Sequence, residues 1–281
     1  MKLLNASIFF KNKKNIRLFI FGGYIMLLFL ISIIAPVLVN HDPYEMNPSE
    51  RFREPGGEYF FGTDEFGRDI YSRIIVGSRM TLIISITSAS IAMILGVIFG
   101  LIAAYLGNPL DTIIMRIADI MLCFPTMLLC IFVIAFAGSS LINVIITISI
   151  VYMPRFTRLA YSSTLSTQGK EYIKASIVLG ASNFRTMFRH ILPNIFSSII
   201  VLFSLAIGHI IIIESSLSYL GLGPPIDIPA WGRMIQQSSR FMNLSYYGVI
   251  FPAVAISTTI LAFNLFGDAL RDYYDPRLSI E

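Results

Sequence analysis

Two ionisable side chains within an apolar stretch are the first candidates for chemistry in this chain. His209 and Glu214 lie inside the run Phe196–Leu220. An ionisable group at membrane depth is a functional candidate because its exposure to lipid is costly. Glu214 falls close to the end of the run, which leaves three roles open: facing a solute pathway, pairing with a partner, or capping the next loop. We treat both residues as pathway candidates.

No constellation for catalysis or metal binding accompanies them. His190 has no Cys, Asp or second His at ligand spacing. Cys123 and Cys130 lie about two helical turns apart, too far for a disulfide, and are expected to be small buried side chains on one helix face. Gly169-Lys170 lacks the preceding glycine of a phosphate loop. We therefore expect no enzyme activity, no metal site and no cofactor bound by this chain.

The composition favours a lipid environment. Of 281 residues, 55% are hydrophobic and 14% are charged, roughly half the charged share of an ordinary soluble domain. The net charge of +4 is weak evidence for nucleic acid, so we expect a membrane and no nucleic-acid partner.

Apolar stretches of about 20 residues predict an all-α polytopic membrane protein with six transmembrane helices. Residues 120–154 carry no charge, and the break at Gly138-Ser139-Ser140 favours a hairpin over one long helix there. Arg116 and Asp119 are expected to pair near the start of the third span, and Pro125 to kink it. The six predicted spans are Leu18–Val39, Met80–Leu106, Ile113–Phe136, Leu141–Tyr161, Phe196–Leu220 and Tyr247–Leu270.

The distribution of Lys and Arg predicts that both termini are cytoplasmic. Residues 1–17 hold five basic side chains and no acid, whereas residues 40–78 hold four Arg against eight acids. Residues 155–194 hold six basic side chains and one acid, Glu171. The predicted organisation is a cytoplasmic segment 1–17, an anchor helix 18–39, an external loop 40–78, a core 79–270 with a cytoplasmic loop 162–195, and a tail 271–281.

The cytoplasmic loop carries two short helical patterns. Glu171 opens the first, where a carboxylate favours a helix N-terminus, and Gly180 ends it. Ser182 is a fitting N-cap for the second helix, and Pro193 is expected to stop it. The apolar stripes are Ile173, Ile177 and Val178 in the first pattern, and Phe184, Met187, Phe188 and Ile191 in the second.

Two interpretations of these helices fit the pattern equally well. They lie on the membrane surface as basic amphipathic segments, or they dock into a groove of a partner protein. A resemblance favours docking. The stretch resembles the EAA loop of binding-protein-dependent ABC importers, with Ser176 where a second alanine is usual and the other motif positions occupied by Glu171, Ala175, Gly180, His190, Pro193 and Asn194.

The resemblance covers nearly the whole chain and is closest to the C-type permease of dipeptide, oligopeptide and nickel transporters. Four further blocks carry it in order and at the expected spacing. They are Phe61–Asp69 with Ser72-Arg73 and Gly77–Arg79, Arg116–Asp119 with Phe124-Pro125, Glu214–Gly223 with Ala230–Gly232, and Asn264–Asp272 with Asp275–Arg277.

The resemblance implies a type I ABC importer half in the bacterial inner membrane. Its implied partners are a second permease subunit, two ATPase subunits that use ATP and Mg, and an extracytoplasmic binding protein. Peptides are the first expectation for cargo, and nickel or a metal–chelator complex is the alternative. A gradient-driven secondary transporter is the rival class, but no internal repeat is visible and Glu214 is the only acid deep in a span.

We make limited predictions for two segments that are expected to lie on the external side. Trp231 is expected to be an interfacial aromatic anchor. Phe61–Arg79 is expected to form a surface helix whose charges pair with one another, or part of an external vestibule as the resemblance implies.

Overall fold

The computed structural model describes residues 13–225 and 228–274, and this part of the chain is helical apart from its loops and one β-bridge between Thr63 and Asp69. The long helices are α2 (Lys13–Leu38), α3 (Ile70–Leu106), α6 (Leu141–Gln168), α9 (Leu192–Tyr219) and α11 (Tyr247–Tyr274). The shorter elements are η1 (Pro48–Glu50), α4 (Leu110–Cys123), α5 (Thr126–Ala137), α7 (Glu171–Val178), α8 (Asn183–Arg185), η2 (Thr186–Ile191) and α10 (Trp231–Ser239).

Membrane-crossing segments account for most of the described residues. Five helical runs are long and apolar enough to cross a bilayer: α2, α3, α6, the continuous run Asn183–Tyr219 and α11. Helices α4 and α5 pass the same test only together, and they are bent by 97° at the break between them. With this pair counted as one span, the described residues carry the six predicted segments, which confirms the all-α polytopic fold.

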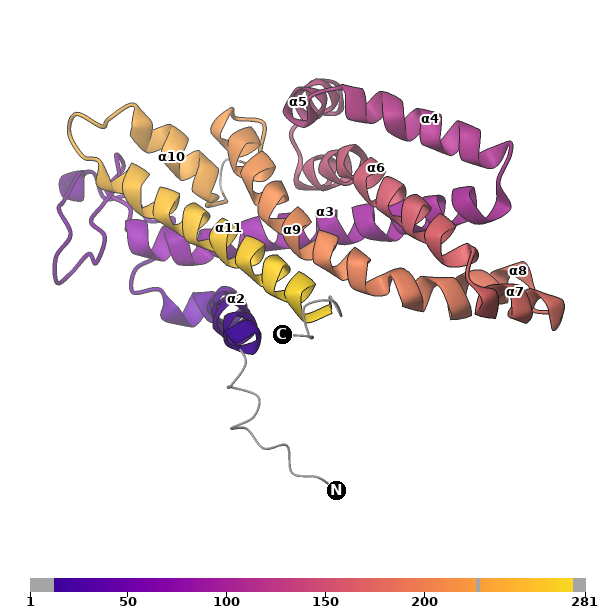
Figure 1. Cartoon of the computed structure of the whole chain (residues 1–281). Helices are drawn as coiled ribbons and strands as arrows, with labels where there is room; N and C mark the ends of the chain where they lie inside the picture. Colours follow the sequence, from indigo (N-terminus) through magenta and orange to yellow (C-terminus); the bar gives the residue numbers. More distant parts are fainter. Residues whose placement is uncertain (1–12, 226–227, 275–281) are drawn as a thin grey trace.

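Helices α3, α6, α9 and α11 run along the long axis of the molecule (Figure 1). Helices α7 and α8 lie at one end, beyond the last turns of α3 and α6. Helix α10 and the segment that precedes α3 lie at the opposite end. The two ends of the molecule are therefore formed by different segments of the chain.

Close packing of α3 against α6 forms the centre of the fold. A Cβ atom at Gly96 would lie 2.6 Å from the Phe156 Cβ, and one at Gly100 would overlap the Thr157 carbonyl oxygen. Small residues at this four-residue spacing let helix backbones approach, which is how transmembrane helices associate without a hydrophobic driving force. The Ser88 hydroxyl adds a bond to the Ile145 carbonyl at 3.3 Å.

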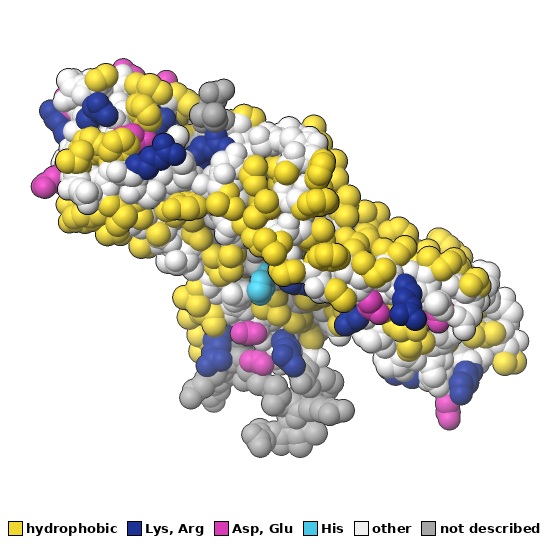
Figure 2. Space-filling model, turned by 90° about the horizontal axis from the view of Figure 1, so that it is seen from above, with side chains coloured by type: hydrophobic (Ala, Val, Ile, Leu, Met, Phe, Trp, Pro, Cys, Tyr) yellow, Lys and Arg dark blue, Asp and Glu magenta, His cyan; other side chains and the backbone are white. Residues whose placement is uncertain are grey.

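Helix α2 lies at the side of this core. It packs on α11, where the Gly22 backbone lies against the Phe266 ring, and the Tyr24 hydroxyl donates to Thr258 Oγ1 at 3.0 Å. Its outer face exposes apolar side chains such as Ile33 and Val37. On the face seen in Figure 2, hydrophobic side chains form a broad band and most charged ones lie toward the ends. Such a band fits a lipid-facing surface.

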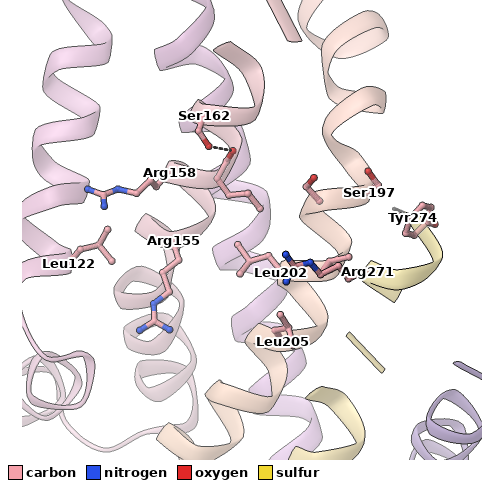
Figure 3. Close-up of a pocket in the computed structure, with 12 residues that line it drawn as sticks. Leu122, Arg155, Arg158, Ser162, Ser197, Leu202, Leu205, Arg271 and Tyr274 are labelled. Atoms are coloured by element: carbon pink, nitrogen blue, oxygen red, sulfur yellow. Dashed lines mark hydrogen bonds between the residues drawn. The ribbon is translucent and has the colours of Figure 1, made fainter. Parts of the chain in front are cut away.

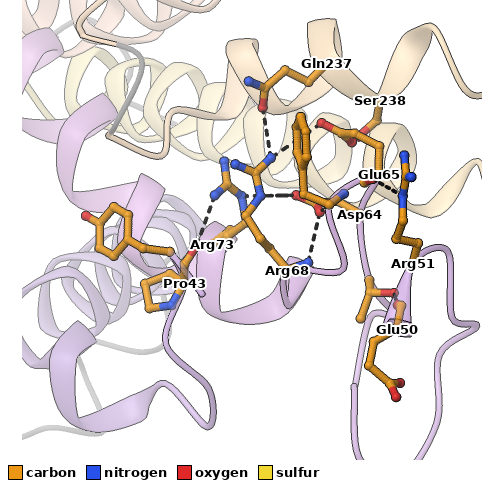
Figure 4. Close-up of polar contacts among 12 residues, drawn as sticks. Pro43, Glu50, Arg51, Asp64, Glu65, Arg68, Arg73, Gln237 and Ser238 are labelled. Atoms are coloured by element: carbon orange, nitrogen blue, oxygen red, sulfur yellow. Dashed lines mark hydrogen bonds and ion pairs between the residues drawn. The ribbon is translucent and has the colours of Figure 1, made fainter. Parts of the chain in front are cut away.

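A buried ionic cluster joins the segment before α3 to α10 (Figure 4). Arg68 Nε lies 2.7 Å from Asp64 Oδ2, and its Nη2 lies 3.4 Å from Glu65 Oε1 and 3.3 Å from Gln237 Oε1. Arg73 lies 3.6 Å from the same Asp64 oxygen. Burial raises the pKa of the Glu65 carboxyl above its usual value, with the Asp64 charge acting in the same direction. The charges of this segment do pair, but in the interior rather than on a surface.

Two sequence predictions are corrected here, and one is confirmed. Helix α3 begins at Ile70, ten residues before the predicted span, because Asp69 caps it by accepting from the Ser72 N–H at 3.0 Å. The predicted kink at Pro125 is confirmed, because the third span bends by 97° where it breaks at Phe124 and Pro125 into α4 and α5. Consequently the two cysteines do not share one buried helix face: Cys123 is exposed and Cys130 is buried.

Trp231 is not an interfacial anchor. Its side chain is 1% exposed, in a small cluster with Ile70, Ile74 and Met234. Its indole N–H donates to the Ile74 carbonyl at 3.0 Å. The indole therefore fixes the first residue of α10 against the start of α3.

Adding one methyl group at the α3–α6 contact tests its role. We expect Gly100→Ala to lower the thermal unfolding midpoint by several degrees, because overpacking a close contact costs about 1–3 kcal/mol. Gly23→Ala on α2 is the matched control, since no atom lies within 4 Å of the place where its Cβ would be. The buried, single Trp231 provides the fluorescence signal in detergent. Equal midpoints for the two variants would contradict the packing argument.

Candidate functional site

The α7–α8 loop, defined here as residues 169–194, is anchored to the helix core through its first helix. Ile173 of α7 is completely buried and belongs to a cluster with Leu101 of α3, Ala160 of α6 and Ile191 of η2. Three helical segments thus hold one side chain of the loop. The predicted stripe of α7 is only partly buried, because Ile177 and Val178 are exposed.

Gly180 forms the elbow of the loop. Its φ is +85°, a conformation that side chains oppose, and no atom crowds the position of a Cβ there. Its N–H bonds to the Ile177 carbonyl at 2.9 Å, and the Ala181 N–H bonds to the Ser176 carbonyl at 3.1 Å. This pair of bonds is the Schellman motif that ends helices. The predicted end of the first helix at Gly180 is confirmed.

The second helix begins as predicted but does not end as predicted. Ser182 caps it by accepting from the Arg185 N–H at 3.3 Å, and the Tyr105 hydroxyl bonds to Asn183 at 3.2 Å. Pro193 does not stop the helix: it lies in the first turn of α9, and the helical run continues to Tyr219. The π-helical stretch η2 directly precedes α9, so the winding of the run changes immediately before Pro193.

The predicted apolar stripe of the second helix divides into two faces. Met187 and Ile191 point into the core, whereas Phe184 is 70% exposed and Phe188 is half-buried. The two phenylalanine rings pack on each other with centroids 4.5 Å apart. Together with Pro193 and two arginines they line a hollow of about 570 Å³. The wider turn of η2 separates residues that an α-helix would align.

Two of the most exposed apolar residues of the chain lie beside the elbow. Val178 is 86% and Leu179 87% exposed. With Phe184 they present apolar surface on a loop at the far end of the molecule (Figure 1). Sequence reasoning gave Val178 only as part of the apolar stripe of the first helix, and it missed Leu179. The available signal was an apolar pair directly before the glycine that ends a helix.

The other motif residues surround this surface. Glu171, Ala175, Pro193 and Asn194 are exposed, while Ser176 and His190 are half-buried. The Ser176 hydroxyl donates to the Ile173 carbonyl at 2.8 Å. The Asn194 amide donates to the His190 carbonyl at 2.7 Å across the η2–α9 junction. These bonds give Ser176 and Asn194 local roles that stabilise the loop backbone.

The two pathway candidates have opposite environments. Glu214 is completely buried, and its carboxylate accepts from the Ser218 hydroxyl at 2.7 Å and from Ser215 at 3.4 Å. Glu214 therefore has no surface toward a pathway in this conformation and stabilises the end of α9. His209 is exposed on α9, so it keeps a surface on which a solute could pass.

The predicted pair of Arg116 and Asp119 does not form. Asp119 instead makes an ion pair with Arg158 of α6. The Asp119–Arg158 pair joins α4 to α6, so it does not depend on the three-residue spacing of Arg116 and Asp119 within α4. The predicted ion pair within one helix is replaced by an ion pair between two helices.

A model of one protein family matches residues 96–280, which include the whole α7–α8 loop. The family is described as the inner membrane component of binding-protein-dependent transport systems. The chain belongs to this family. It is an integral membrane protein and a permease subunit of the C type found in peptide ABC importers.

Relatives are similar over almost the full permease. The dipeptide transport system permease protein DppC of Alkalihalophilus pseudofirmus is 43% identical over 270 residues, covering 96% of this chain and 89% of the relative. The glutathione transport system permease protein GsiD of Pectobacterium atrosepticum is 41% identical, with 92% and 86% covered. A putative peptide transport permease of Brucella suis is 37% identical, with 92% and 88% covered.

The Gly180 elbow of the permease can be tested locally. We expect Gly180→Ala to raise amide hydrogen exchange across residues 171–185 about fivefold, because a side chain in the left-handed conformation costs about 1 kcal/mol. Gly169→Ala is the matched control, with a φ of −68° and no atom near its Cβ position. Exchange rates that are unchanged in both variants would contradict the strain at Gly180.

Proposed function

We propose that this permease couples to an ATPase subunit by inserting the α7–α8 loop into a groove of that subunit. The observation that carries the proposal is the exposed apolar surface of Val178, Leu179 and Phe184 on a loop whose base is anchored by Ile173. Apolar helix residues that insert into a partner groove are a recurring docking mode. A loop that is anchored in the core at Ile173 and exposed at Val178 and Leu179 can bind a partner and transmit its movement to the helices.

The proposal assigns the chemistry to other chains. Two ATPase subunits bind and hydrolyse ATP with Mg, a second permease completes the pathway, and an extracytoplasmic binding protein delivers the cargo. This chain contributes half of the pathway and no catalytic residue or bound cofactor. The membership of a binding-protein-dependent transport family supports this assembly.

The orientation in the proposal follows from charge. The α7–α8 loop contains Lys170, Lys174, Arg185 and Arg189 against Glu171, and it is placed in the cytoplasm with both termini. The acidic segment 40–78, with eight acids against four Arg, is placed outside, together with α10. This orientation puts the exposed apolar tip on the side where ATP is available.

Peptides are the proposed cargo. The relatives at 43% and 41% identity are a dipeptide and a glutathione permease, both named for peptide substrates. No observation in the described residues favours nickel or a metal–chelator complex, since no cluster of three His, Cys, Asp or Glu side chains occurs among them. Peptide import is therefore the function that the site and the similarities support best.

Replacing the apolar pair at the tip tests the docking proposal. We expect Val178→Ser with Leu179→Ser to lower the ATPase copurifying with the solubilised permease pair at least about tenfold, because each lost side chain removes about 1.5–3 kcal/mol of burial. Leu244→Ser is the control, since Leu244 is 69% exposed at the α10 end. Full ATPase recovery with the double variant would contradict the docking surface.

Uptake by the purified complex tests the cargo. We expect proteoliposomes containing both permeases, the ATPases and the binding protein to accumulate a labelled dipeptide in the presence of ATP and Mg. Nickel uptake should stay at the level measured without ATP. Nickel accumulation without peptide accumulation would reverse the cargo assignment and leave the docking proposal in place.

A further inference from the structure

A groove of about 870 Å³ opens between the helices of the bundle, and its polar lining is basic (Figure 3). Residues of α4, α6, α9 and α11 line it. The charged residues among them are Arg155, Arg158 and Arg271, and no acid is included. Serines 162, 197 and 198 add hydroxyl groups. The groove therefore offers positive charge and hydrogen-bond donors within a bundle that is otherwise apolar.

Arg155 differs from its neighbour Arg158 in how its charge is balanced. Both are on α6, and Figure 3 shows their side chains extending in different directions. Arg158 pairs with Asp119, whereas no carboxylate within the described part of the chain pairs with Arg155. Arg155 lies in the half of the predicted fourth span nearer the cytoplasmic loop, and a charge inside a span is costly unless it faces a water-filled cavity. The groove provides that cavity.

Neutral groups hold the Arg155 guanidinium in place. Its Nη2 donates to the Thr126 hydroxyl at 3.1 Å, and its Cζ lies 4.4 Å from the centroid of the Tyr152 ring. Thr126 is the first residue of α5, directly after the break in the third span. A hydroxyl and an aromatic face orient the group without cancelling its charge. Thr126 occupies one of the guanidinium N–H donors, of which arginine has five.

No acid is among the described residues that line the groove. An oriented, uncompensated guanidinium with free donors matches a carboxylate, which accepts two parallel N–H bonds from arginine.

We propose that Arg155 binds the terminal carboxylate of the transported peptide as it passes through the groove. This inference rests on the proposed peptide cargo and adds a recognition residue to the pathway. Thr126 is a positioning residue that aims the guanidinium. A phospholipid headgroup has an anionic group of similar chemistry, and it is an alternative outcome of the test.

Protection of Arg155 from chemical modification tests the binding site independently of transport. In the complete complex, phenylglyoxal should modify Arg155, as detected by peptide mass spectrometry. A dipeptide should slow this modification, and the same dipeptide with a C-terminal amide should not. Equal rates with both compounds would overturn the proposal, whether or not the complex transports peptide. Protection in a complex that transports no peptide would instead overturn the proposed cargo and leave the carboxylate site standing.

Variants test the role in transport. In proteoliposomes, Arg155→Gln should lower dipeptide uptake about tenfold, and Arg155→Lys should retain more uptake than Gln because it keeps the charge. Arg116→Gln is the control: Arg116 is exposed on α4 and does not line the groove. Recovery of assembled complex should be equal for all variants. If Arg155→Gln and Arg155→Lys lowered uptake and recovery of the assembled complex to the same extent, Arg155 would have a structural role and the proposal would be overturned.

Varying the lipid composition of the vesicles distinguishes a peptide carboxylate from a lipid headgroup as the ligand of Arg155. Wild-type uptake and Arg155 modification should not change when the phosphatidylglycerol fraction of the vesicles is raised at constant dipeptide concentration. Protection of Arg155 by phosphatidylglycerol in the absence of peptide, with no further effect of the dipeptide, would assign the groove to a lipid headgroup and overturn the inference.

Discussion

The close approach of α3 and α6 is the contact on which the rest of the structure depends. Gly96 and Gly100 leave no room for a Cβ, so the two backbones meet directly and fix the rotation of α6. On α6, Arg158 pairs with Asp119 of α4, and Arg155 donates to Thr126 of α5. Because apolar burial contributes little to helix association in lipid, such steric fit carries much of the specificity. The groove and the base of the α7–α8 loop both follow from it.

Polar chemistry is distributed unequally along the bundle. At the α10 end, the carboxylates of Asp64 and Glu65 balance the guanidinium of Arg68, and all three side chains are buried. In the groove, Arg158 pairs with Asp119, whereas the described contacts of Arg155 are the hydroxyl of Thr126 and the ring of Tyr152. A buried charge needs a partner unless water reaches it. The first arrangement is suited to rigid attachment and the second to an anion that arrives and leaves.

The α7–α8 loop combines rigidity at its base with exposed surface at its tip. Ile173 is held by residues of α3, α6 and η2, and the Schellman bonds at Gly180 set the angle between α7 and α8. Val178 and Leu179 lie directly before that elbow and remain outside. Residues of α6 and α9 belong to the cluster around Ile173, and the same two helices contribute residues to the groove.

The sequence alone determined the fold class, most of the spans, the end of the first loop helix and the start of the second. Hydrophobic length reports directly on bilayer thickness, and Gly180 and Ser182 act through local backbone conformation. Tertiary structure decided what depends on residues far apart in the chain. Asp119 pairs with Arg158 instead of Arg116, and Trp231 is buried against Ile74. Pro193 lies within a helical run, and Glu214 is completely buried. These outcomes depend on which helix faces each side chain, and a pattern along one helix carries no information about its neighbour.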